Sequence, residues 1–246
     1  MKQTVTLHPA ITHRHFAVID STNAYLMKNE LPCPYLVSAD TQTAGHGRRQ
    51  QAWIDEGKSL LFSLATAFDA HINVGAWSVQ VALTLAKILE NVTEQALLIK
   101  WPNDLYVKND SGEYGKCAGI LTESSIGKQG KMVTGAGINL APIKGVIDSD
   151  YAIASVDICV DDSVLLIQIA NELYWQWQDF IQSPAVSPEH YARYDMLSGE
   201  MLLATNLHNH RESVGQACGI NAQGQLLLQQ HGGLLALTTQ HHIRLL

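Results

Sequence analysis

The stretch ALLIKWPNDLYV, residues 96–107, decides the fold. Two short apolar runs flank a Pro-Asn-Asp turn at 102–104, a pattern that predicts a strand, a tight turn and a second strand. Apolar runs of strand length also occur elsewhere, and further buried strands are expected at 59–68, 115–123 and 131–140. These segments supply the strands of the predicted sheet.

Helical periodicity lies between these strands. Residues 76–90 carry an apolar stripe at helical spacing, made by Trp77, Val81, Leu85 and Ile88. Because strands and helices are interleaved without a strict βαβ repeat, the pattern predicts a mixed α+β fold.

Two more helices are expected in the second half of the chain. Asp162 or Ser163 can cap a long helix that covers 164–182. Its aromatic residues are expected to form a buried stripe rather than a cofactor site, and they are Tyr174, Trp175, Trp177 and Phe180. Ser187 and Pro188 are typical of a helix start, and Gly199 can end that third helix.

The sequence changes in character after Gly199. Short apolar runs are separated by turn signals such as NHRES, NAQG and HGG. This pattern predicts a small β-barrel of about five strands without a helix. We therefore expect two domains, a larger one at 1–198 and a small β-barrel at 199–246.

Composition and charge argue against several classes of protein. The 246 residues include 16 basic and 23 acidic ones, so a net charge of −7 gives no global positive field for nucleic acid or an anionic membrane. No apolar run approaches the ~20 residues of a membrane helix, and the first residues lack the apolar core of a secretory signal. Four scattered cysteines without a CxxC pair are typical of reduced thiols, so a cytoplasmic protein is expected.

Eleven histidines raise the question of a metal site. They include three pairs near the termini or in turn-like segments, which are His13/His15, His208/His210 and His241/His242. None is combined with acidic or cysteine partners at ligand spacing. We therefore interpret them as solvated surface residues.

Four polar clusters stand out as candidate site residues. The first is STN at 21–23, which contains a helix cap and offers adjacent hydrogen-bonding side chains to a pocket. The second is GHGRR at 45–49, where glycines allow a tight loop and the arginines suit a carboxylate or phosphate. Gln42 precedes this loop and Trp53 follows it.

The third cluster is the turn itself, where Lys100 and Asp104 are either a surface ion pair or reactive side chains placed at a strand end. The fourth begins at Lys116, which opens a strand expected to be buried, so its ammonium must reach a partner or a wet cleft. Glycines at 119, 135 and 137 let a ligand lie against bare backbone.

Four cations thus lie among glycines and amides with few carboxylates, namely Arg48, Arg49, Lys100 and Lys116. No P-loop, Ser-His-Asp arrangement or reactive cysteine context accompanies them. The set favours chemistry that brings two anions together, such as a carboxylate attacking a nucleotide phosphate.

These motifs resemble those of biotin–protein ligases of the biotin–[acetyl-CoA-carboxylase] ligase type. The matching stretches keep the family's order and spacing, and they are STN at 21–23, QTAGHGRR at 42–49, KWPNDL at 100–105, GKCAGILTE at 115–123 and GAGIN at 135–139. The resemblance implies a mixed sheet flanked by helices, followed by a small SH3-like β-barrel.

The resemblance also implies a two-step reaction. Biotin and ATP give biotinoyl-5′-AMP and pyrophosphate, and a lysine of a biotin carrier domain then attacks the mixed anhydride and releases AMP. ATP, Mg²⁺ and biotin are the expected small molecules, with no tightly bound prosthetic group. The protein is expected to be a monomer or a homodimer.

Residue roles follow from the same resemblance. Catalysis is assigned to Arg48, Lys100, Asp104 and Lys116. Biotin is expected to contact Ser21, Thr22, Asn23, Gln42, Gly45, His46, Gly47, Arg48, Lys116 and Gly119. The nucleotide is expected to contact Arg48, Arg49, Trp53, Lys100, Asn103 and Asn139. Asp104 either holds Mg²⁺ or helps to deprotonate the incoming lysine.

Two departures from the family pattern matter. The family reads GRGRRG where this chain reads GHGRRQ, so His46 replaces an arginine and Gln50 a glycine. Because histidine is mostly neutral at pH 7 and arginine is permanently charged, we expect looser retention of the adenylate. Too little chain precedes Ser21 for a helix-turn-helix domain, so no DNA binding is expected.

Two alternatives stay open. A lipoate or octanoate ligase of the same fold is the first, although the paired KWPND and glycine–arginine motifs favour biotin. The second is a biotin sensor that keeps the pocket without catalysis, for which His46 is the one indication in the sequence.

Overall fold

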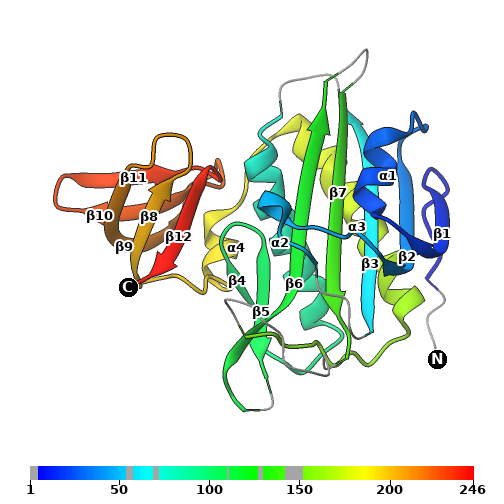
Figure 1. Cartoon of the computed structure of the whole chain (residues 1–246), viewed down its shortest axis with the longest axis horizontal. Helices are drawn as coiled ribbons and strands as arrows, with labels where there is room; N and C mark the ends of the chain where they lie inside the picture. Colours follow the sequence, from blue (N-terminus) through cyan, green and yellow to red (C-terminus); the bar gives the residue numbers. More distant parts are fainter. Residues whose placement is uncertain (1–4, 54–57, 69–71, 110, 127–129, 142–151) are drawn as a thin grey trace.

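The computed structural model describes residues 5–53, 58–68, 72–109, 111–126, 130–141 and 152–246. In these residues, seven strands form a mixed sheet, in the order β1-β2-β3-β7-β6-β5-β4 (Figure 1). They are β1 (Thr12–Ile19), β2 (Tyr35–Gln42), β3 (Ser59–Phe68), β4 (Leu98–Lys100), β5 (Asp104–Lys108), β6 (Tyr114–Ser125) and β7 (Gly130–Asn139). β1 and β2 are parallel, and the other neighbouring pairs are antiparallel. The predicted α+β class is confirmed.

The helices are short or buried. They are α1 (Thr22–Lys28), the 3₁₀ turn η1 (Arg48–Gln50), α2 (Val74–Glu90), α3 (Asp162–Gln182) and α4 (Pro188–Ala192). α2 begins where the Asn73 side chain accepts a hydrogen bond from the Ala76 backbone N–H. The stripe expected on this helix is buried at Trp77, Val81 and Leu85.

Alternation along the strands gives the large sheet two unlike faces. On one face, residues such as Leu60, Phe62 and Leu64 of β3 join the main core beneath α2 and α3. On the other face lies α1 (Figure 1), whose Leu26 packs with Val37, Ala65 and Val133. Beyond α1 this second face carries small and polar residues, so it can hold a cavity.

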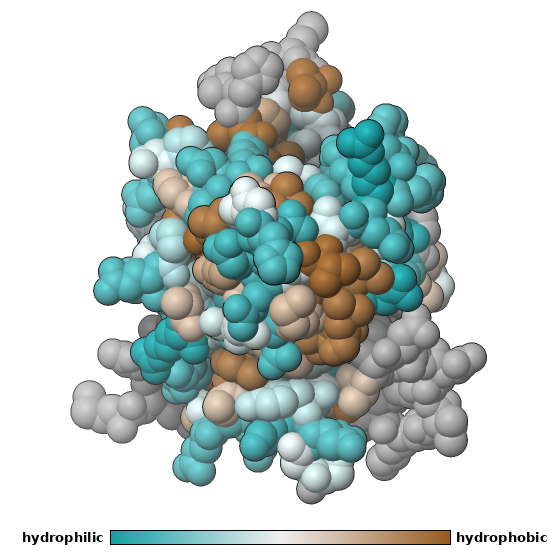
Figure 2. Space-filling view, turned by 90° about the vertical axis from the view of Figure 1, so that its left-hand side faces the viewer, coloured by the Kyte–Doolittle hydropathy of each residue, from teal (hydrophilic) through white to brown (hydrophobic). Residues whose placement is uncertain are grey.

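The small sheet is antiparallel and lies within residues 201–245, all of which are described. Its strands are β8 (Met201–Asn206), β9 (Glu212–Ile220), β10 (Leu226–Gln230), β11 (Gly233–Leu237) and β12 (His241–Leu245), in the order β11-β10-β9-β8-β12. Five strands were expected here, and five are found. Figure 2 views this end of the molecule, where hydrophilic surface surrounds patches of hydrophobic side chains. Val214 and Leu234 of the small sheet are among the exposed apolar residues.

The two sheets share one core and a polar contact. Apolar residues of the small sheet, such as Leu202 and Leu228, belong to the same buried cluster as those beneath the large sheet. The Trp101 indole Nε1 donates to Gly224 O at 2.9 Å, and both groups are buried. The turn at 100–104 therefore contacts the C-terminal part of the chain directly. The domain boundary between residues 198 and 199 stays a prediction.

Several expectations about helices were wrong in detail. The N-cap of α3 is Asp161, not Asp162 or Ser163. The Trp175 side chain is 52% exposed, so it lies outside the predicted buried stripe, whereas Trp177 and Phe180 are buried. α4 ends at Ala192 rather than Gly199, because the backbone of Tyr194 and Met196 hydrogen-bonds to Ile99 of β4 instead of continuing the helix.

No helix among the described residues is both long and apolar enough to cross a membrane.

Candidate functional site

A cavity of about 670 Å³ opens on the α1 side of the large sheet. Its walls come from α1, the loop at 46–53, strands β3 to β7 and the last strand of the small sheet. The lining residues with polar side chains include Ser21, Thr22, Asn23, Gln42, His46, Arg48, Arg49, Trp53, Ser63, Lys100, Asn103, Asp104, Tyr106, Lys116, His242 and Arg244.

A buried polar network forms one end of the cavity. Ser21 caps α1 by accepting from the Ala24 N–H, and this places Thr22 and Asn23 on the cavity side. Ser63 Oγ of β3 lies 2.6 Å from Asn23 Oδ1 and 2.7 Å from Thr22 Oγ1. Because Asn23 Oδ1 can only accept, the Ser63 hydroxyl donates to it.

Two further contacts fix the direction of this network. Asn23 Nδ2 donates to Glu123 Oε2 at 2.9 Å, and Gln42 Oε1 accepts from the Thr22 backbone N–H at 2.7 Å. Glu123 is an acceptor when ionised, so it orients the Asn23 amide. The network therefore presents donors and acceptors to the cavity in one fixed arrangement.

A β-bulge in β6 brings Lys116 to the cavity. Leu105 pairs with Ala118 and Tyr106 with Lys116, so Cys117 is an extra residue in β6. One inserted residue reverses the alternation of faces, and both Cys117 and Ala118 are buried in the core. Lys116 thereby lies on the same face as Gly119, whose added Cβ would be 3.2 Å from Lys116 Nζ.

The Lys116 ammonium pairs with a carboxylate of the neighbouring strand. Its Nζ lies 2.8 Å from Asp104 Oδ1, and the two side chains are 13% and 26% exposed. Asp104 is opposite Lys100 in the β4–β5 ladder, and Lys100 Nζ lies 5.7 Å from the Tyr106 ring centroid. Three charged residues of three adjacent strands thus meet on one wall.

Cys117 has no part in this polar wall. Burial raises the pKa of its thiol to about 12, so it stays protonated at neutral pH and is not a nucleophile. Its role in the site is to occupy the extra position of the bulge.

The loop at 46–53, called here the arginine loop, bounds the cavity on the side of the small sheet. Arg48 Nη1 donates to Asn103 Oδ1 at 3.2 Å, and its Nη2 donates to Thr239 O. Burial first, and then Arg49, lowers the pKa of Arg48, which nevertheless remains charged because the starting value is so high. Arg49 has φ 59°, a left-handed conformation uncommon for a residue with a side chain.

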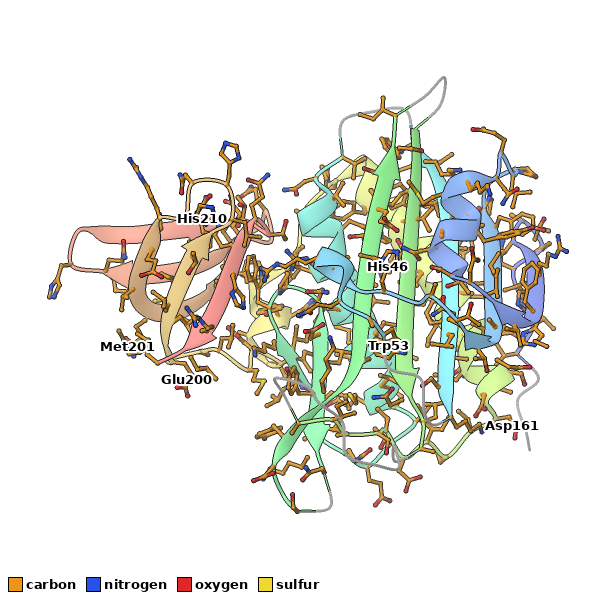
Figure 3. The ribbon with its side chains drawn as sticks, viewed as in Figure 1. His46, Trp53, Asp161, Glu200, Met201 and His210 are labelled. Carbon is orange, nitrogen blue, oxygen red and sulfur yellow. The ribbon has the colours of Figure 1, made fainter. Side chains whose placement is uncertain are left out.

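Trp53 lies over the glycines of the central strands (Figure 3). A Cβ added at Gly119 or Gly137 would be 2.9 Å or 2.6 Å from its ring, so bare backbone is required there. The Lys116 Nζ lies 5.9 Å from the ring centroid. The indole N–H is buried without a hydrogen-bond partner among the described residues, and an acceptor in a bound ligand would satisfy it.

The sequence profile of the Biotin/lipoate A/B protein ligase family matches residues 15–139, about half of the chain. The chain belongs to this family. It is 31% identical over 229 residues to the bifunctional ligase/repressor BirA of Escherichia coli, covering 87% of this chain and 68% of that protein. It is 27% identical over 207 residues to a biotin–[acetyl-CoA-carboxylase] ligase of Mycobacterium tuberculosis, covering 79% and 73%.

A solved structure of this biotin/lipoate protein ligase family has the same fold. It is the biotin protein ligase of Aquifex aeolicus in complex with biotin and ATP, with a TM-score of 0.78 and 20% identity. The match covers 96% of this chain and 99% of that one. The expected fold, a mixed sheet with helices and a small SH3-like C-terminal domain, is thereby confirmed.

The fold of the present chain brings most of its predicted site residues together. The 21–23 cluster, Gln42, the loop from His46 to Arg49, Trp53 and the lysines of β4 and β6 all line one cavity. Asn139 does not line it, because its side chain bonds to Ser59 and to the Ala154 carbonyl. Gly45 is not a lining residue either, and a Cβ there would lie 2.9 Å from Gln42 Nε2.

Other cavity residues were not predicted from the sequence. Ser63, Trp101 and Tyr106 lie in strands or turns whose apolar pattern indicated only a buried position. His241, His242 and Arg244 come from β12 and line the cavity; His242 remains exposed, as expected of a solvated residue, but its place in the cavity was not predicted. The alternation of His242 and Arg244 on one strand face was the signal available for them.

Proposed function

We propose that this chain is a biotin–protein ligase. In the first step the biotin carboxylate attacks the α-phosphorus of ATP, forming biotinoyl-5′-AMP and releasing pyrophosphate. In the second step the amine of a carrier-domain lysine attacks the acyl carbon, forming an amide and releasing AMP and a proton. The observation that carries the proposal is Lys116, turned by a bulge into a cavity where Asp104 and Arg48 also lie.

The charges of the cavity suit the first step. Two anions, a carboxylate and a phosphate, must approach each other, and cations fixed beforehand stabilise the charge that develops. Lys116 would bind both reacting groups, and Lys100 with Arg48 and Arg49 would neutralise the phosphates. The closed arginine loop would also shield the anhydride from water.

The buried polar network at one end of the cavity would bind the ring system of biotin. Biotin carries a ureido ring, which needs fixed donors and acceptors, and the 21–23 cluster with Gln42 and Ser63 offers them. Trp53 and Asn103 would contact the nucleotide. Four unpaired thiols fit a reducing compartment, so we place the reaction in the cytoplasm.

The donor set fits Mg²⁺ delivered with the nucleotide. Among the described residues that line the cavity, Asp104 carries the one carboxylate. Mg²⁺ is commonly held by one or two carboxylates together with substrate phosphates, so Asp104 would be its protein ligand. The ion would neutralise phosphate charge, while Asp104 also orients the Lys116 ammonium.

The test mixes protein, biotin, [α-³²P]ATP and Mg²⁺, with and without an apo biotin carrier domain. We expect labelled adenylate that depends on biotin and is consumed when the carrier is added, with biotin appearing on the carrier lysine. Lipoate and octanoate are run in parallel. Adenylate formed from either of these but not from biotin would replace the proposal with the lipoate-type activity, and biotin binding without adenylate would favour a sensor.

Ser63→Ala is expected to weaken biotin binding by about 10- to 100-fold. The change leaves the buried Asn23 Oδ1 without its donor, and an unsatisfied buried polar group costs about 1–3 kcal/mol. Isothermal titration of biotin measures the dissociation constant. Thr66→Val is the matched control, because Thr66 is also on β3 and its buried hydroxyl has no partner among the described residues. Equal effects of the two variants would contradict the prediction.

His46→Arg is expected to slow release of the adenylate about tenfold. A permanent charge would add a charge-assisted hydrogen bond to the bound phosphate. The dissociation rate is measured by trapping released adenylate after rapid dilution. His208→Arg adds the same charge at an exposed position of the small sheet and is expected to leave the rate unchanged. An unchanged rate in His46→Arg would refute the idea.

A further inference from the structure

The strand β12 faces the cavity with two side chains that the reaction described above does not use. His242 and Arg244 are two residues apart on one strand, so they leave the small sheet on the same face. Both line the cavity, together with Lys100 at the end of β4 and Arg49 in the arginine loop. Three elements that are far apart in the sequence therefore converge on this end of the cavity.

The surroundings of His242 are cationic. His242 is exposed, but its partial burial lowers its pKa, and Arg49, Arg244 and Lys100 lower that pKa further. Its cross-strand neighbour on β8 is the uncharged Thr205, and Glu212 of β9 stands one strand further along the same row. The adjacent His241 bonds through its ring to Asn206 and to the Thr238 carbonyl.

The one carboxylate among the described residues that line the cavity is already paired with another cation. Asp104 is paired with Lys116 at 2.8 Å. A neutral imidazole among three cations is the expected state at neutral pH, because a fourth positive charge would be repelled. A polyanion placed among the cations would reverse the sign of the local potential and favour the protonated ring.

We propose that His242 is the proton-accepting member of a polyphosphate subsite formed with Arg49, Lys100 and Arg244. The subsite holds the part of the nucleotide that leaves as pyrophosphate, so it rests on the proposed function and extends it. Binding of the polyanion adds one proton to the His242 ring, and departure of pyrophosphate returns that proton to solvent. The small sheet thereby links pyrophosphate affinity to pH.

The sign of the pH dependence follows from this linkage. At about pH 7 to 8 the free ring is neutral, so binding takes up a proton and its affinity falls as the pH rises. Well below the pKa of the free His242 ring, the ring is itself protonated and the proton uptake disappears. The affinity ratio of wild type to His242→Gln is expected to grow by about 5- to 10-fold between pH 8 and pH 6, within the limit of about 100-fold that one proton allows over two pH units. Taking the ratio cancels the protonation of pyrophosphate itself.

The experiment titrates the full chain with inorganic pyrophosphate in EDTA at pH 7, in buffers of different ionisation enthalpy. The slope of the observed heat against that enthalpy counts protons taken up. We expect His242→Gln to lower the count by a substantial fraction of one proton. His242→Arg should also lower it while binding pyrophosphate tightly even at pH 8.

Two control variants test whether the proton taken up on pyrophosphate binding belongs to His242. His46→Gln removes another cavity histidine and is expected to keep the His242 proton. His208→Gln removes an exposed histidine of the small sheet and is expected to match wild type. Equal proton counts in wild type and His242→Gln, or tight binding lost in His242→Arg, would overturn the inference.

The outcome is separable from that of the proposed function. Adenylate formation with no His242-dependent proton would remove this subsite and leave the ligase intact. A His242-dependent proton without adenylate formation would leave the polyphosphate subsite intact and remove the ligase activity.

Discussion

Lys116→Met is expected to lower the rate of biotinoyl-adenylate formation by about 100- to 1,000-fold. Removing one preorganised donor to a developing charge has an effect of about this size in other enzymes. Here the loss also leaves the Asp104 carboxylate facing the two reacting anions without its cation. Single-turnover formation of labelled adenylate at saturating ATP measures the effect on the chemical step.

A matched control separates the local effect from loss of positive charge. Lys108 is exposed on β5 of the same sheet, and its Nζ lies 5.5 Å from the Tyr114 ring centroid rather than in the cavity. Lys108→Met is expected to keep the wild-type rate. Lys116→Arg is expected to recover part of the activity, because it keeps the charge but changes the donor geometry. A rate for Lys116→Met within twofold of wild type would contradict the assignment of this lysine.

Gly135→Ala is expected to abolish measurable biotin binding and to destabilise the protein. The added Cβ would lie 2.0 Å from Asn23 Oδ1 and 2.9 Å from Ser63 Oγ, so both buried side chains would have to move. Overpacking of a closed core costs about 1–3 kcal/mol, and here the displaced groups are those of the polar network. Isothermal titration with biotin and the melting temperature measure the two effects.

Two further variants make this result specific. Gly232→Ala adds the same methyl group in the small sheet, where no atom lies within 4 Å, and should resemble wild type. The double variant Gly135→Ala with Asn23→Ala removes the contact with Asn23 and leaves the 2.9 Å approach to Ser63 Oγ, so the melting temperature should recover in part while biotin binding stays weak. Recovery of both would show that Asn23 does not contribute to binding.

The fold could be predicted where a segment packs on the core. β3 is buried along most of its length and α2 packs one stripe on the main core, so an apolar run marks the strand and helical periodicity marks the helix. β1 could not be predicted because it is an edge strand, largely exposed on both faces, and no alternation marks it. The end of α4 depends on hydrogen bonds to Ile99, about ninety residues earlier, which no local pattern records.

The site could be predicted to the extent that its residues form local motifs. The 21–23 cluster, the arginine loop and the turn at 100–104 are contiguous, so each combines charge, amide and glycine within a few residues. Ser63 and His242 join the cavity from β3 and β12, where they are single polar residues among others. Only the packing of the two sheets shows that they face the same space.

The bulge at Cys117 has a consequence for which changes of strand pairing the site tolerates. Deletion of Cys117 would leave Lys116 opposite Tyr106 and two residues from Gly119, so the ammonium would stay on the cavity face. A regular ladder that keeps Cys117 would instead pair Lys116 with Val107 and turn its side chain into the apolar layer beneath α2. In related chains, an aligned lysine therefore reaches the cavity only where the strand keeps this bulge or lacks the inserted residue.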